Sequence, residues 1–162
     1  MKKGLCLVLA LMLAVLFGGN ALAEKVDLPQ SGYSVTIPDG MAYSGKRNSA
    51  DDVDFVWLSD ALGLEIQFTH AKNDRNVTLK AMATVLREDG YDAEIRRVSG
   101  IDMIVYEGTD PDDDPAEAMK FITYVFLEGD VAQQICFWYA NQNAADLTLE
   151  IIESITARTD GK

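Results

Sequence analysis

Two neighbouring segments in the second half of the chain are apolar on both faces, and no other feature constrains the fold as strongly. Residues 119–127 and 131–140 have the length of long strands, and only Glu128, Gly129 and Asp130 separate them. Their apolar or aromatic positions are Phe121, Ile122, Tyr124, Val125, Phe126, Ile135, Cys136, Phe137, Trp138 and Tyr139. A strand that is apolar on both faces has to be covered on both faces. The pair therefore predicts a hairpin in the middle layer of a layered domain.

Shorter segments before this hairpin have the pattern of half-buried strands. Apolar side chains recur at every second position in residues 33–37, 53–57 and 64–69, which is the period of a strand with one buried face. The short link over residues 59–63 predicts that the second and third of these strands form a hairpin.

Two further strands are predicted in residues 93–97 and 101–106, around a turn at Ser99-Gly100. The first of them has the weaker pattern. In contrast, we expect residues 24–31 to be a loose polar lead-in and residues 41–50 to form a loop.

Two segments have the period of amphipathic helices. In the first, one apolar stripe is formed by Leu79, Met82, Ala83 and Leu86. Asn76 or Thr78 can cap its start, and Gly90 can end it. The second is expected to open at Asn143, with Asp146 in its first turn and Leu147, Ile151 and Ile155 on its buried face.

These elements together predict an α+β domain. We expect an antiparallel sheet of about six to seven strands flanked by helices, in an α/β/α layered sandwich. No internal repeat or interdomain linker is visible in the sequence.

The first residues have the pattern of an export signal. Lys2 and Lys3 precede an apolar run over residues 5–17, and Ala21-Leu22-Ala23 follows it, which is typical of a secretory signal peptide and its cleavage site. The alternative is a membrane anchor, but the run is shorter than the roughly 20 residues of a spanning helix. We therefore expect residues 1–23 to be removed before Glu24. Residues 24–162 would remain as a single secreted or periplasmic domain that does not insert into the membrane.

The net charge argues against one class of function, and the cysteine content excludes an intrachain disulfide in the processed chain. The full chain has 14 Lys plus Arg against 26 Asp plus Glu, a net charge of −12, and loss of Lys2 and Lys3 makes it −14. Such an excess of acid argues against nucleic-acid binding, which requires basic side chains on the phosphates. Only Cys136 remains after cleavage. No disulfide can form within that chain, and we expect Cys136 to be a small buried apolar residue.

Residues 32–41 (Gly-Tyr-Ser-Val-Thr-Ile-Pro-Asp-Gly-Met) resemble the opening motif of the PsbP-like family. This broad group includes the photosystem II extrinsic subunit P, a Ran-binding nuclear import factor and bacterial DcrB-like envelope proteins. The later order of elements is also similar, although Met41 stands where the family often has Trp. The resemblance implies an antiparallel sheet sandwiched by helices and a binding or accessory role. It implies no catalytic residue.

An acidic stretch at residues 110–117 offers one candidate site. Asp110, Asp112 and Asp114 have the spacing of a calcium loop, in which oxygen ligands converge on the ion. However, Pro115 replaces the glycine of the sharp turn, and Phe121 stands where the bidentate Glu would be. A solvated loop and a weak calcium site both remain open, and no other cofactor is expected.

The remaining candidates are weaker. His70 is the only histidine and could act as a general base, but no nucleophile with recognisable spacing accompanies it. The aromatic residues of 119–140 could pack in the core or line a groove for an apolar ligand or peptide.

We therefore predict a non-catalytic, exported binding domain. Its expected partner is a protein or peptide of the cell envelope or exterior, of basic character. The alternative is a calcium- or small-ligand-binding module that uses residues 110–117, and an enzyme is the third possibility.

Overall fold

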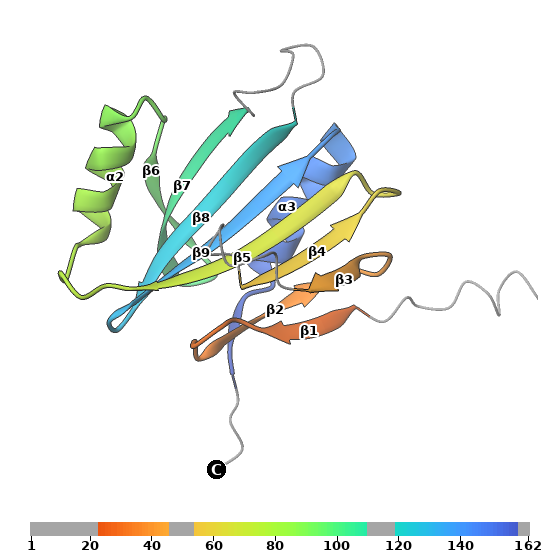
Figure 1. The fold of residues 1–162 in the computed structure, drawn as a ribbon, viewed down its shortest axis with the longest axis horizontal. Coiled ribbons are helices and arrows are strands. Elements are labelled where there is room, and N and C mark those ends of the chain that lie inside the picture. Colours follow the sequence, from red (N-terminus) through yellow and green to blue (C-terminus); the bar gives the residue numbers. More distant parts are fainter. Residues whose placement is uncertain (1–22, 46–53, 110–118, 159–162) are drawn as a thin grey trace, which may run out of the picture.

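The computed structural model describes residues 23–45, 54–109 and 119–158. A seven-stranded antiparallel sheet forms its middle layer, in the order β3-β4-β5-β9-β8-β7-β6 (Figure 1). Its strands are β3 (Ala42–Gly45), β4 (Phe55–Ser59), β5 (Leu64–Lys72), β6 (Glu94–Val98), β7 (Ile101–Thr109), β8 (Lys120–Glu128) and β9 (Val131–Tyr139). The predicted α+β class, the antiparallel sheet of six to seven strands and the β8–β9 hairpin are confirmed.

The β8–β9 hairpin is central, as its two apolar faces predict. Strand β9 pairs along its whole length with β5 on one side and with β8 on the other. Phe126, Ile135 and Phe137 point to one face and are almost fully buried. Cys136 and Thr123 are also buried, on the opposite face.

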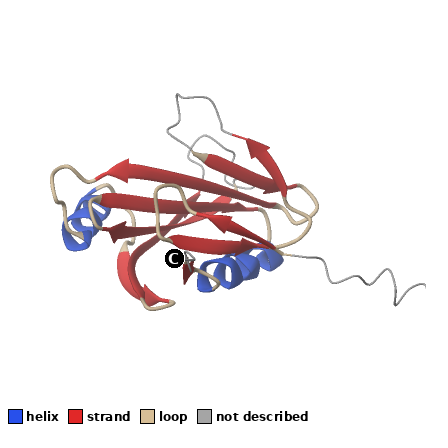
Figure 2. Ribbon diagram, turned by 90° about the horizontal axis from the view of Figure 1, so that it is seen from below, coloured by secondary structure: helices blue, strands red, loops and turns tan. Residues whose placement is uncertain are grey.

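A helix and a second, smaller sheet cover the first face. Strand β2 (Tyr33–Ile37) lies between β1 (Glu24–Asp27) and β10 (Thr156–Ala157), and α3 (Gln142–Glu153) packs beside them (Figures 1 and 2). Val35 and Ile37 of β2 and Ile152 of α3 join the core cluster of Phe126 and Phe137. This cluster is the main core of the domain.

Helix α2 (Leu79–Glu88) packs on the other face, at the β6–β7 end of the sheet. Ala83 of α2 is fully buried against Ile104 of β7, and Leu79, Met82 and Leu86 pack around them. The Thr78 side chain accepts a hydrogen bond from the Ala81 N–H, so one of the two predicted capping residues is the cap. Helices therefore lie on both faces of the sheet, as the layered arrangement requires.

The structure corrects four expectations. Residues 24–27 of the predicted lead-in form β1, and residues 42–45 of the predicted loop form β3. Both are four-residue strands whose only support is pairing with a neighbour, so they carry no periodic pattern. Asn141 caps α3, which places Asp146 beyond the first turn. His70 lies inside β5 rather than after it.

No helix in the described part of the chain is long and apolar enough to span a membrane.

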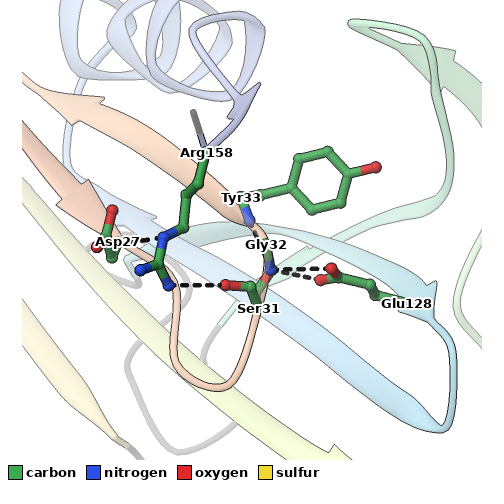
Figure 3. Close-up of polar contacts among 6 residues, drawn as sticks. All are labelled: Asp27, Ser31, Gly32, Tyr33, Glu128 and Arg158. Atoms are coloured by element: carbon green, nitrogen blue, oxygen red, sulfur yellow. Dashed lines mark hydrogen bonds and ion pairs between the residues drawn. The ribbon is translucent and has the colours of Figure 1, made fainter. Parts of the chain in front are cut away.

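A carboxylate at the tip of the central hairpin holds the small sheet in place (Figure 3). Glu128 accepts hydrogen bonds from the Ser31 hydroxyl at 2.5 Å and from the Gly32 N–H at 2.8 Å. On the other side of the same turn, the Arg158 side chain bonds to the Ser31 carbonyl at 3.1 Å and lies 3.4 Å from the Asp27 carboxylate. A Cβ at Gly32 would lie 2.9 Å from the Glu128 Oε1. The glycine that opens the PsbP-like motif therefore allows this close approach.

We predict that Glu128→Ala lowers the free energy of unfolding by about 1–3 kcal/mol, because two charge-assisted hydrogen bonds to the β1–β2 turn are lost. Urea unfolding followed by circular dichroism measures this. Glu150→Ala on the exposed face of α3 is the matched control and should leave the midpoint nearly unchanged. Equal midpoints for the two variants would contradict the assigned role of Glu128.

Candidate functional site: an aromatic groove between two sheet edges

The predicted calcium site cannot be placed in the structure. Asp110, Asp112 and Asp114 lie outside the described residues. Within residues 23–45, 54–109 and 119–158, no group of three or more His, Cys, Asp or Glu side chains is placed to hold a metal ion. The calcium site therefore stays a prediction.

His70 is held by one carboxylate. Its Nδ1 lies 2.6 Å from the Asp54 Oδ2, and its backbone N–H donates to the same oxygen at 2.8 Å. Asp54 directly precedes β4, and its own N–H donates to the Phe68 carbonyl. No serine, threonine or cysteine side chain in the described chain bonds to the imidazole. The pair thus ties the start of β4 to β5.

Cys136 is buried between β5 and β8, as predicted. Burial raises the pKa of its thiol to about 11, although a hydrogen bond with Thr123 acts in the opposite direction. The thiol therefore stays protonated near neutral pH, and a protonated thiol is neither a nucleophile nor a metal ligand.

Most aromatic side chains of the central hairpin serve the core. Phe126 and Phe137 are fully buried, and Tyr124 packs edge-on against Phe137 with ring centroids 5.9 Å apart. On the opposite face, Phe121 contacts Trp138 at 5.0 Å. Of the two uses considered for these residues, the structure supports packing.

A different set of aromatic side chains lines a groove that the sequence pattern does not reveal. The groove has a volume of about 530 Å³ and lies between β1 and the β3–β4 end of the large sheet. Its lining residues are Glu24, Lys25, Val26, Asp27, Tyr43, Phe55 and Trp57. Strands β1 and β3 are both terminal strands of their sheets, so the groove runs between two sheet edges.

Three rings form one wall of this groove. The ring of Tyr43 lies 6.1 Å from that of Phe55 and 5.5 Å from that of Trp57. Tyr43 and Trp57 are directly paired across β3 and β4. Tyr43 is 53% exposed, whereas Trp57 is only 8% exposed. The result is an aromatic surface with a buried base and a solvent-accessible outer ring.

Trp57, at the buried bottom of the groove, has one unsatisfied polar group. The indole N–H of Trp57 has no hydrogen-bond partner among the described residues. A buried donor without an acceptor is costly. Trp57 therefore holds its position through packing, with Tyr43 on one side and the main core on the other.

The polar lining comes from β1. Val26 packs against the main core, so Glu24, two residues away, shares its face of the strand. Asp27 is engaged with Arg158. The groove thus combines π faces, which accept apolar or cationic groups, with the charged side chains of Glu24 and Lys25 in its lining.

The sequence pattern does not reveal this groove because its parts lie in segments without periodicity. Glu24–Asp27 belongs to the expected lead-in and Tyr43 to the expected loop. Only the alternation of Phe55 and Trp57 was visible, and it is equally typical of core packing. Tyr43 contacts Trp57 because the register of the β3–β4 pair places these two residues opposite each other.

Comparison with known proteins supports the fold. No protein-family model matches the sequence, and no curated protein matches it. Among solved structures, cyanobacterial PsbP (CyanoP) from Synechocystis has a TM-score of 0.66 at 15% identity, over 86% of this chain and 94% of CyanoP. The Ran-binding protein Mog1p from Saccharomyces cerevisiae has a TM-score of 0.58 at 12% identity, over 85% of this chain and 96% of Mog1p.

A crystal structure from Bacteroides thetaiotaomicron is also similar, with a TM-score of 0.63 at 14% identity over 86% of this chain. This chain covers only 50% of that protein. At such identities the likeness shows the fold. It is the PsbP-like fold that the Gly32–Met41 pattern predicts.

The raised pKa of Cys136 predicts a loss of stability at alkaline pH. Above pH 9 the unfolded thiol ionises, whereas the folded thiol holds its proton until about pH 11. Stability should therefore fall as the pH rises between these values, by about 2–3 kcal/mol from this residue.

Cys136→Ala removes this contribution. Its unfolding midpoint in urea should decline less than that of the parent between about pH 8 and about pH 10.5. Tyr124, whose pKa is also raised by burial, titrates in both proteins. The pKa of Tyr106 is raised mainly by burial and partly by Cys136, so only that smaller part changes in the variant. Equal declines would show that the thiol is not buried as described.

Proposed function

We propose that this domain is an exported, non-catalytic binding domain that holds an extended, basic segment of another cell-envelope or extracellular protein in the groove between β1 and β3. One observation carries the proposal: three clustered rings, the outermost half exposed, wall an open groove of about 530 Å³. Exposed aromatic surface of this kind is typical of an interaction site.

The chemistry of the wall favours Lys or Arg side chains. An ammonium or guanidinium group over an aromatic ring is stabilised by the negative charge on the ring face. The acidity of the domain acts in the same direction, because a net charge of −12 for the full chain attracts basic segments and speeds their encounter. We therefore expect binding to weaken as salt is added.

The strands beside the groove favour an extended partner. Strands β1 and β3 are the ends of their sheets, and an end strand can accept main-chain hydrogen bonds from a peptide that adds to it. Alternate side chains of such a peptide would point to the rings of Tyr43, Phe55 and Trp57.

The fold neighbours are compatible with this role. One of them is a Ran-binding protein, so this fold can present a protein-binding surface. The PsbP-like resemblance of residues 32–41 implies a binding or accessory role as well. The calcium-binding alternative rests on residues 110–117, which lie outside the described residues.

The start of the described fold agrees with export. Strand β1 begins at Glu24, the residue that the predicted cleavage would make N-terminal, so the cut would leave the strand whole. The new α-ammonium group would sit beside the Glu24 carboxylate and offset its charge. The rings and the overall field of the domain, rather than Glu24 alone, would then hold a cationic side chain.

Tyr43→Ala should weaken the binding of a short peptide of alternating Lys and Val by about three- to tenfold, because the exposed ring supplies cation–π and apolar contact. Isothermal titration calorimetry on the processed protein measures this. A peptide of the same length with alternating Glu and Val serves as the charge-reversed control and should bind less well than the basic one.

Leu149→Ala is the matched control variant, because Leu149 is an exposed apolar side chain on α3, away from the groove. Its affinity for the basic peptide should equal that of the parent. If both peptides bind equally, or if Tyr43→Ala and Leu149→Ala behave alike, the groove is not the binding site.

Export itself is tested separately. N-terminal sequencing of the protein recovered from outside the cytoplasm should begin Glu-Lys-Val-Asp, the sequence of β1. Recovery of the full-length chain only, in the cytoplasm, would refute export and leave the peptide titration unaffected.

A further inference from the structure

Strand β6 is the other end of the seven-stranded sheet, opposite β3. Four of its five residues are exposed, and they include Ile95, an apolar side chain that is 44% exposed. Glu94 and Arg96 flank Ile95 and form an ion pair with each other at 2.8 Å. Exposed charges on an end strand usually prevent sheets from joining edge to edge.

The charges of β6 have an arrangement that permits one particular partner. In an antiparallel pair, directly opposed residues lie on the same face of the sheet. If a two-fold axis passes through Ile95, then Ile95 faces Ile95 of the second copy. In the same register, Glu94 of each copy faces Arg96 of the other. The opposed pairs formed by residues 94–96 are then all apolar with apolar or acidic with basic, and Arg97 faces Ala93.

We propose that β6 is a homodimerisation edge, through which two copies pair antiparallel about Ile95 and continue the large sheet across the axis. The outward main-chain groups of β6 would be satisfied by the second copy. Two Glu94–Arg96 pairs would form between copies, and the two Ile95 side chains would be removed from water.

The neighbouring side chains leave this edge available. Arg97 is engaged with Asp102 of its own chain at 3.0 Å, and Arg87 of α2 binds the Ala93 carbonyl before the strand begins. The opposite edge offers no equivalent arrangement, because β3 reads Ala-Tyr-Ser-Gly and has no charged side chain. The self-complementary charge pattern therefore favours a second copy at β6 over a different protein.

Charge reversal tests the register directly. Arg96→Glu places two acidic pairs across the axis, and Glu94→Arg places two basic pairs there. The dimerisation affinity of each variant alone should be at least about tenfold lower than that of the parent. Sedimentation equilibrium of the processed protein over a concentration series up to about 1 mM measures this.

Mixing the two variants is the decisive step. One copy then has Arg at both positions and the other has Glu at both, so all opposed pairs are complementary and a heterodimer should form. The double variant with Glu94→Arg and Arg96→Glu should dimerise like the parent. Arg97→Glu is the matched control, because Arg97 faces the uncharged Ala93 and the Glu94–Arg96 and Ile95–Ile95 pairs are unchanged; it should retain the parent affinity.

Crosslinking gives an independent reading. Ile95→Cys should form a disulfide between copies under mild oxidation, because residue 95 faces itself across the axis. Arg97→Cys should not, because the two copies of residue 97 lie several residues apart in this register. Cys136 is buried and does not compete.

A parent protein that stays monomeric up to about 1 mM would overturn the proposal. So would a parent dimer that survives both single reversals, or a mixture that fails to form the heterodimer. Circular dichroism checks that each variant is folded. If a charge-reversal variant is unfolded, the comparison of Ile95→Cys with Arg97→Cys tests the dimer register instead.

Discussion

The structure depends on one hairpin that cannot be left in contact with water on either face. Strands β8 and β9 bury Phe126 and Phe137 on one face and Cys136 and Thr123 on the other. Apolar burial is the dominant favourable contribution to folding. The position of β9 between β5 and β8, and the packing of α3 and the small sheet on one face, follow from the need to cover this hairpin.

The second constraint is how the small sheet is attached. Apolar contact of Val35 and Ile37 with the main core is not directional, so it does not by itself orient β2. Glu128 supplies the direction, because its two oxygens bind the turn at Ser31 and Gly32. Gly32 is required at that point since a side chain would meet the carboxylate. The sequence motif that marks strand β2 thus marks its attachment as well.

The two surfaces that we propose for binding lie at the ends of the sheets, away from this centre. The groove is bordered by β1 and β3, and the proposed dimer edge is β6; all three are terminal strands. Central strands have both edges paired and both faces covered, so they have no free main-chain groups to offer a partner. End strands retain free groups, and the side chains on them decide whether a partner can approach. In this domain one end carries exposed aromatic rings and the other carries a charge pattern that matches itself.

The sequence by itself determined the elements whose pattern spans several residues. The two-faced apolar hairpin, the stripe of α2 with Thr78 as a possible cap, and the one-sided strand β5 could all be predicted, because each repeats its signal over two or more periods. The PsbP-like opening motif was also readable, and with it the fold. Only the tertiary structure decided the positions of β1 and β3, the contact of Tyr43 with Trp57 and the pairing of Asp54 with His70. A four-residue strand has no period to detect, and its conformation comes from the strand it pairs with. The candidate groove is built from such segments, so its residues meet only when the two sheets are in place.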